Sequence, residues 1–153
     1  MKKMRFDYVE IGTSCFKTLA EIYKNDDTIT GLSLEAVPQY LDVLKEHCKN
    51  AQNKYFMNCA VSEESSRFID FYFIDPEKVK NWVAVGIAGL GCTSIDLLKN
   101  TIADQVPEFR LDHSQIKKIS VPSMRFSEII EKFSIEEVGF LKIEAEGCDH
   151  DIL

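Results

Sequence analysis

The residues best placed to do chemistry are three acidic residues and one glycine, each at or near the end of a predicted strand. They are Glu10, Gly12, Glu35 and Glu144. The carboxyl ends of parallel strands meet at one edge of an open α/β sheet, and ligands bind at that edge. Carboxylates there would repel a pyrophosphate and attract a cation. The pattern therefore favours a sulfonium cofactor, S-adenosyl-L-methionine, over a dinucleotide, although any one glutamate taken alone could merely cap or solvate a strand end.

The first of these strands leads into a predicted glycine turn and helix. Aromatic and β-branched residues dominate 6–11, and we expect Gly12, Thr13 and Ser14 to end the strand and cap the helix. From Phe16 onward the apolar residues follow the i, i+3, i+4, i+7 spacing of one helical face. Glycine allows close approach of the backbone, and a helix start offers free N–H groups, so this unit predicts a nucleotide-type cofactor site. Glu35 ends the next strand. Its separation from Glu10 along the sequence is typical of a carboxylate that binds ribose hydroxyls.

The remaining pattern predicts one α/β domain, residues 1–153, with a doubly wound sheet. Further strands are expected at 28–35, 54–61, 67–74, 116–121 and 138–145. Two further amphipathic helices are marked by Val37, Leu41, Leu44 and Cys48, with Pro38 in the first turn, and by Phe126, Ile129, Ile130 and Phe133. The strand at 67–74 is apolar on both faces, so we expect it to be covered on both sides. The segment 75–112 carries no clear assignment.

A second glycine motif offers the main alternative site. Gly86, Gly89 and Gly91 do not have the G-x-G-x-x-G spacing of a dinucleotide loop, and no acidic strand end follows at the right distance. A nicotinamide-dependent oxidoreductase is therefore disfavoured. We expect this segment to be a loop that borders the ligand pocket.

The charge composition of the chain argues against two classes of binding partner. The 153 residues carry 18 basic and 25 acidic side chains, a net charge of −7, and basic residues never run beyond a pair. Nucleic acid and anionic membrane are disfavoured as partners.

The cysteines and histidines do not follow metal-binding patterns. Five cysteines without a C-x-x-C pair predict reduced thiols, and three histidines without metal-ligand spacing predict no metal site. With no signal-peptide core or spanning apolar run, we expect a soluble, cytoplasmic protein.

Several motifs resemble those of the FkbM family of S-adenosylmethionine-dependent methyltransferases. The segment 141–153, L-K-I-E-A-E-G-C-D-H-D-I-L, is similar to the family's L-K-I-D-x-E-G-x-[ED]-x-x-[IV]-L. The segment 9–16, V-E-I-G-T-S-C-F, resembles V-D-V-G-A-N-x-G, with Ser14 for Asn and Phe16 for the second glycine. Leu34 to Pro38 resembles the family's x-E-P-x-P, 58–62 resembles its third-strand end, and 91–95 resembles a segment of one branch.

The resemblance implies a Rossmann-like class I methyltransferase fold, a small-molecule hydroxyl substrate on a sugar or secondary metabolite, and SN2 methyl transfer. It implies that Glu10 and Gly12, with Ser14 in the same motif, approach the methionine end of the cofactor. Glu35 would bind the ribose diol. Ala60 and Val61 would lie along the adenine. The resemblance also places Glu144 and Glu146 near the transferred methyl, with Glu144 the first choice of general base and His150 the second; His150 could instead be an exposed helix-start residue.

Two departures from the family pattern keep a second hypothesis open. Phe16 puts bulk where the family has glycine, and the sequence ends one turn after the strand at 138–145, which we expect to be the fourth core strand. That strand would then be an apolar sheet edge, which favours association. The alternative is a fragment or a non-catalytic cofactor-binding or assembly module, such as a homodimer that pairs through its sheet edges.

Overall fold

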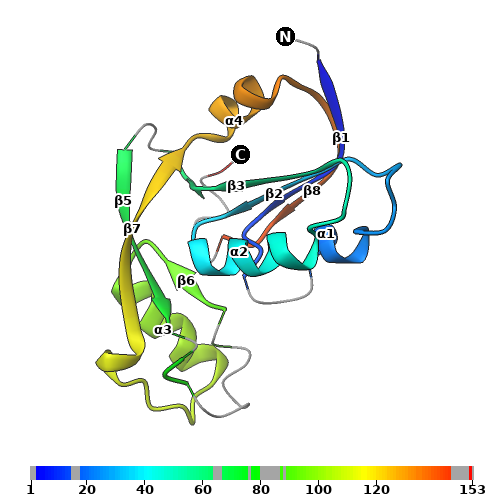
Figure 1. The fold of residues 1–153 in the computed structure, drawn as a ribbon. Helices are drawn as coiled ribbons and strands as arrows, with labels where there is room; N and C mark the ends of the chain where they lie inside the picture. Colours follow the sequence, from blue (N-terminus) through cyan, green and yellow to red (C-terminus); the bar gives the residue numbers. More distant parts are fainter. Residues whose placement is uncertain are drawn as a thin grey trace.

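In the computed structural model the first three strands and the last strand of the chain form a parallel sheet, and a second sheet stands beside it (Figure 1). The structure describes residues 3–14, 18–63, 67–75, 77–79, 87, 89–145 and 152. In the first sheet the order is β3 (Lys54–Asn58), β2 (Gly31–Glu35), β1 (Met4–Ile11) and β8 (Ile135–Ile143). Every pair in it is parallel, so the carboxyl ends of its strands meet at one edge.

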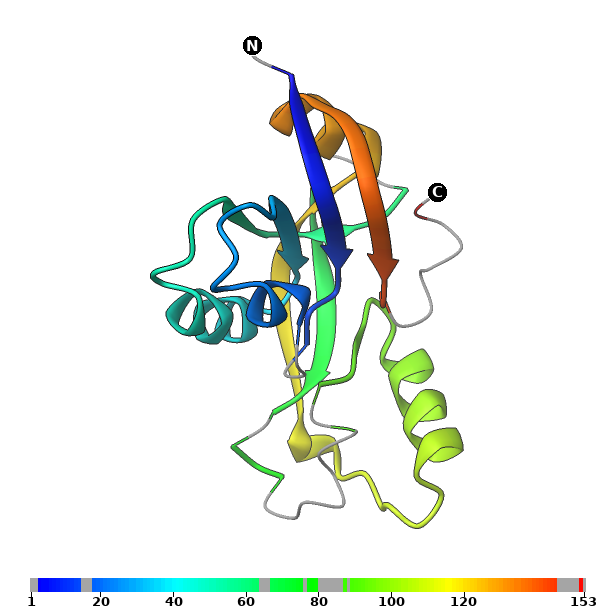
Figure 2. The same ribbon diagram turned by 90° about the vertical axis from the view of Figure 1, so that its right-hand side faces the viewer.

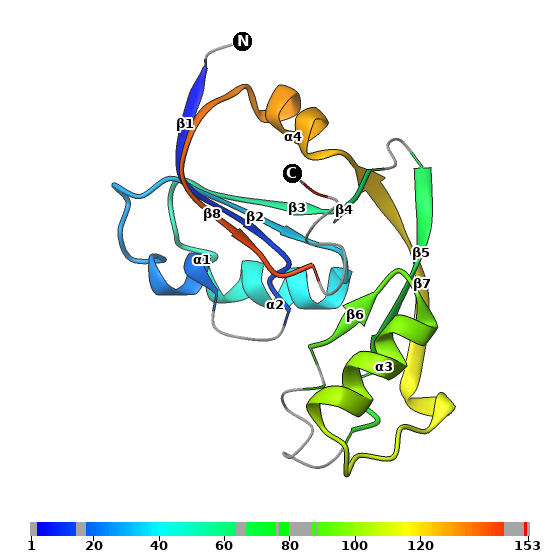
Figure 3. The same cartoon turned by 180° about the vertical axis from the view of Figure 1, so that it is seen from behind.

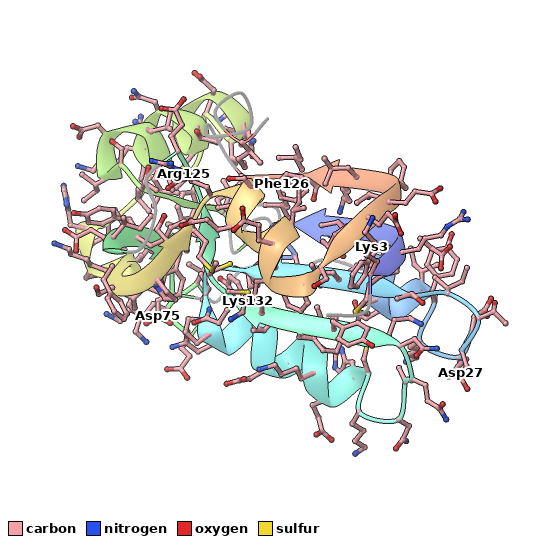
Figure 4. The ribbon with its side chains drawn as sticks, turned by 90° about the horizontal axis from the view of Figure 1, so that it is seen from above. Lys3, Asp27, Asp75, Arg125, Phe126 and Lys132 are labelled. Carbon is pink, nitrogen blue, oxygen red and sulfur yellow. The ribbon has the colours of Figure 1, made fainter. Side chains whose placement is uncertain are left out.

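Helices lie on both faces of the first sheet (Figures 1 and 4). Helices α1 (Leu19–Ile22) and α2 (Pro38–His47) pack through Ala20 and Leu44 against Tyr8. Helix α4 (Phe126–Phe133) packs on the other side, where Ile129 is fully buried with Phe6. Pro38 occupies the start of α2, where its missing N–H leaves no helical hydrogen bond unmade, as predicted.

The second sheet is mostly antiparallel. Together with α3 (Ile95–Gln105) it forms a second unit that has its own core. The strand order of this sheet is β4 (Ala60–Val61), β7 (Ile116–Met124), β5 (Arg67–Ile74) and β6 (Gly91–Cys92). Strands β5 and β7 form a long antiparallel ribbon, and α3 packs beside it through Leu98 and Ile102 (Figure 2). A short 3-10 helix, η2 (His113–Gln115), precedes β7. The segment 75–112, for which the sequence pattern predicted no clear element, therefore contains β6 and α3.

Two strand predictions are wrong in detail. The expected strand 54–61 breaks at Cys59, and its two parts join different sheets as β3 and β4. Strand β5 is not covered on both sides, because Phe68 is 74% exposed. The apolar pattern suggested a central strand of a parallel sheet, whereas β5 pairs along its length only with β7 and meets β6 at Tyr72 and Phe73 alone.

The first helix is also shorter than predicted and is capped by a different residue. It begins at Leu19, and Thr18 is its N-cap, in a reciprocal capping box with Glu21. Ser14 has a φ of 52°, which is left-handed and cannot start a helix. Thr13 and Ser14 instead belong to a loop, whereas Phe16 lies outside the described residues. Among the described residues, no helix has the length and apolar composition needed to span a membrane.

Candidate functional site

The strands of the parallel sheet run toward the second sheet (Figure 3). A pocket lies at their carboxyl ends. Its empty volume, including the part open to solvent, is about 680 Å³. Six residues singled out from the sequence line it, namely Gly12, Ser14, Glu35, Ala60, Val61 and Glu144. The break at Cys59 turns the chain from one sheet into the other at this point, so that β4 forms a wall of the pocket.

Gly12 closes the end of β1 tightly against β8. Its φ is 79°, and a Cβ atom there would collide with the backbone oxygen of Glu144. Its N–H donates to the carbonyl of Leu34 at 2.9 Å, and the N–H of Glu144 donates to the carbonyl of Ile11 at 2.9 Å. Only glycine satisfies both the left-handed backbone and this close approach, so the residue type is required here.

The carboxylate of Glu35 organises the loop that follows β1. It is 5% exposed, and its Oε2 accepts from the N–H of Thr13 at 2.8 Å, from the Thr13 hydroxyl at 2.9 Å and from the N–H of Ser14 at 2.8 Å. Its Oε1 accepts from the N–H of Val37 at 2.8 Å. The Ser14 hydroxyl donates in turn to the carbonyl of Gly89 at 3.0 Å. These bonds join the ends of β1 and β2 to the glycine segment of the second unit.

Glu10 and Glu144 share one cation, Lys142. The Lys142 Nζ lies 3.0 Å from Oε1 of Glu10 and 2.9 Å from Oε2 of Glu144. Glu10 is fully buried and also accepts from the N–H of Leu19, 3.1 Å away at the start of α1. Burial raises the pKa of Glu10, and the bonds from Lys142 and Leu19 oppose that rise. Partial burial lowers the pKa of Lys142, but its hydrogen bonds to Glu144 and Glu10 outweigh this and raise it.

A comparison with known protein families matches residues 9–153 to the methyltransferase FkbM domain. The chain belongs to this family. Neither the curated proteins nor the solved structures gave a significant match. The resemblance predicted from the motifs at 9–16 and 141–153 is thereby confirmed over nearly the whole chain.

Within this FkbM methyltransferase domain, Glu10 lies differently from the other predicted site residues. It is not among the residues that line the pocket, and its carboxylate instead fixes the start of α1 and the position of Lys142. Glu144 does line the pocket, and its side chain is 52% exposed. Glu146 and His150 lie outside the described residues, so their predicted roles stay predictions.

Sequence reasoning missed Lys142, although a signal for it was present. Lys142 stands two residues before Glu144, and side chains at i and i+2 of a strand share one face. Strand pairing then places Lys142 directly opposite Glu10 in the sheet. The sequence contained the spacing, but only the parallel pairing of β1 with β8 shows which carboxylate lies across from the lysine.

Cys59 lines the pocket but is not suited to nucleophilic catalysis. It is 2% exposed, and burial raises the pKa of its thiol to about 12. A thiol with so high a pKa is protonated at neutral pH, and only the thiolate is a good nucleophile. The described residues contain no cluster of three or more side chains suited to hold a metal ion. The described charged side chains that line the pocket are Glu35 and Glu144.

The shared cation predicts a pH-dependent loss of stability in Lys142→Met. Without Lys142, the pKa of Glu10 should rise further above its ordinary value of 4.5. A carboxyl that binds its proton more tightly in the folded state lowers the free energy of unfolding as the pH rises above that value. We expect a loss of about 1–3 kcal/mol at pH 7, measured by urea unfolding, and a smaller loss at pH 5.

The matched control is the double variant Glu10→Gln/Lys142→Met, which has no carboxyl at position 10. It should show no such pH dependence between pH 5 and pH 7. Equal destabilisation of Lys142→Met at both pH values would contradict the ion-pair assignment.

Proposed function

We propose that this domain binds S-adenosylmethionine at the carboxyl edge of a Rossmann-like, doubly wound sheet and transfers its methyl group to a hydroxyl oxygen. The observation that carries the proposal is the buried Glu35 carboxylate, held at the pocket wall by the loop after Gly12. The strand order β3-β2-β1-β8, with helices on both faces, supports the proposed sheet type.

The lining of the pocket fits such a cofactor. Pockets for small molecules and cofactors are mostly apolar and carry a few fixed polar groups. Here Val37, Ala60 and Val61 are nearly buried and present apolar surface suited to a flat purine. Glu35 and Glu144 supply acceptors for hydroxyl groups and a negative field for a sulfonium.

Each predicted cofactor residue has a place in this scheme. Oε1 of Glu35 accepts one hydrogen bond in the structure, from Val37, so it retains capacity to accept from a ribose hydroxyl. Ala60 and Val61 would flank the adenine, and the backbone at Gly12 and Ser14 would hold the methionine end. Glu10 would act indirectly, by holding Lys142 in place through their ion pair. When bound, S-adenosylmethionine supplies an electrophilic methyl group on a positively charged sulfur.

Glu144 is the proposed general base. Its carboxylate lines the pocket, is half exposed, and is held by Lys142 at 2.9 Å. An ionised carboxylate in that position can accept the proton that an acceptor hydroxyl loses as its oxygen is methylated. Glu146 and His150 remain predicted helpers in this step. The proposed acceptor is a hydroxyl on a sugar or a secondary metabolite.

Glu35→Gln should weaken cofactor binding. The amide places an NH₂ group among donors that now point at a carboxylate, so the loop of Thr13 and Ser14 should lose its fixed form. Loss of hydrogen bonds to a charged acceptor costs about 1.5–3 kcal/mol, so the Kd for S-adenosylmethionine should rise about 10- to 100-fold by calorimetric titration. The control is Glu46→Gln, an exposed carboxylate on α2. An unchanged Kd in Glu35→Gln would rule out the ribose assignment.

Glu144→Gln should separate chemistry from binding. Transfer of a radiolabelled methyl group would be followed across a panel of hydroxyl acceptors on sugars and secondary metabolites, first with the unmodified chain. Because the amide cannot take up a proton, the turnover rate should fall about 10²- to 10⁴-fold, while the Kd for the cofactor stays nearly the same. Glu137→Gln, which changes an exposed carboxylate on β8, is the control. A normal turnover rate in Glu144→Gln would exclude it as the base.

A second candidate function is assembly through the edge of the parallel sheet. Strand β8 ends the order of the described strands, and its Phe140 is 57% exposed. An open strand edge with an exposed aromatic side chain invites pairing with another chain. A non-catalytic module could use this edge to form a homodimer.

Light scattering distinguishes this candidate. If β8 pairs with a second copy, the chain should be a dimer at high micromolar concentration, and Phe140→Lys should make it monomeric, because lysine on an edge strand opposes pairing. Val43→Lys, at a 55% exposed position on α2, is the control and should stay dimeric. A clean monomer of the unmodified chain would dismiss this assembly.

A further inference from the structure

A second hollow lies between α3, the segment that follows it and the start of β7. Its floor is apolar and is formed by Ile102, Phe109, Leu111 and Ile116. Ile102 is 1% exposed and belongs to the core of the second unit, whereas the other three are partly buried and pack against that core. The hollow shares no lining residue with the proposed cofactor pocket. It therefore offers a separate apolar surface, continuous with a folded core.

Basic side chains surround this apolar floor. Lys99 from α3, Arg110 from the following segment and His113 from η2 all line the hollow. Among the described residues, none of the three forms an ion pair. Lys78 lies nearby, because its Nζ donates to the carbonyl of Ser114 at 2.7 Å. Two cations, Lys99 and Arg110, therefore border the apolar floor in a chain whose net charge is −7.

The carboxylate of Asp112, next to His113 in the sequence, is engaged outside the hollow. Asp112 accepts a hydrogen bond from the N–H of Ser114 at 2.8 Å and so caps η2. That backbone bond, with smaller contributions from His113 and Lys78, lowers the pKa of Asp112. Asp112 does not line the hollow, so its carboxylate is committed to the turn beside it. The described residues that line the hollow include Lys99, Arg110 and His113 but no carboxylate.

We infer that this hollow binds an amphipathic organic anion, a carboxylate with an apolar body. The apolar body would cover the floor, where each square ångström removed from water contributes about 25 cal/mol. The carboxylate would meet Arg110 and Lys99, and a guanidinium can grip a carboxylate with two parallel hydrogen bonds. Both features are needed together, since exposed charge pairs alone contribute little. The inference does not depend on methyl transfer.

The test is a calorimetric titration of the full chain with decanoate and with decanol. Decanoate should bind the unmodified chain about tenfold or more tightly than decanol, because only decanoate carries the charge. Lys99→Gln/Arg110→Gln should weaken decanoate binding by a similar factor. Ala103→Trp should also weaken it, because Ala103 is exposed on α3 and lines the hollow, so a bulky ring there fills the space without removing a core contact.

The matched control is Lys24→Gln/Lys117→Gln, which removes two exposed lysines that do not line the hollow. It should bind decanoate as the unmodified chain does, and melting temperatures would show that each variant is folded. Three results would overturn the inference: no decanoate binding at about 1 mM, equal affinity for decanol, or undiminished binding by both hollow variants. Titration with S-adenosylmethionine would be scored separately, since the two sites share no residue.

Discussion

The carboxylate of Glu35 is the interaction on which the rest of the site depends. A buried carboxylate is costly unless its oxygens are hydrogen-bonded, and the chain meets this need by folding the loop after β1 around it. That loop turns at Gly12, whose left-handed backbone lets β1 close against β8. Ser14 then reaches across to Gly89. One side chain thus sets the end of two strands and one wall of the pocket.

Lys142 offsets the repulsion between two carboxylates at the same edge of the sheet. Glu10 and Glu144 both lie near the end of the sheet, and two carboxylates close together without a cation would repel each other. Lys142 lies between the two carboxylates. Parallel pairing of β1 with β8 places it opposite Glu10, and the alternation of side chains along an extended chain places Glu144 on the same face as Lys142. The result is a buried ion pair that steadies α1 and a half-exposed carboxylate that faces the pocket.

The second unit contributes residues to the pocket at the edge of the parallel sheet. Its strand β4 continues the chain directly from β3, and its glycine segment contributes Gly89 and Gly91 to the pocket. The same unit carries the basic hollow beside α3. Among the described residues, the proposed cofactor pocket and the basic hollow therefore share no lining residue.

The sequence by itself determined the elements whose patterns are local. The parallel strands β1, β2, β3 and β8, the helix with Pro38 at its start, the glycine at the end of β1 and the acidic strand ends could all be predicted, because alternation, helical spacing and turn residues depend on neighbours in the chain. The family followed from the same short motifs. The roles of Glu146 and His150 remain predictions, since neither lies among the described residues.

Tertiary structure alone decided the pairing of these elements. The break at Cys59, the exposed face of Phe68 and the shared contacts of Lys142 depend on which strands become neighbours. The shortened first helix has the same origin, since the distant carboxylate of Glu35 competes for the backbone groups of Thr13 and Ser14. Local patterns cannot encode such contacts, because their free energy comes from burial and hydrogen bonding between residues far apart in the chain.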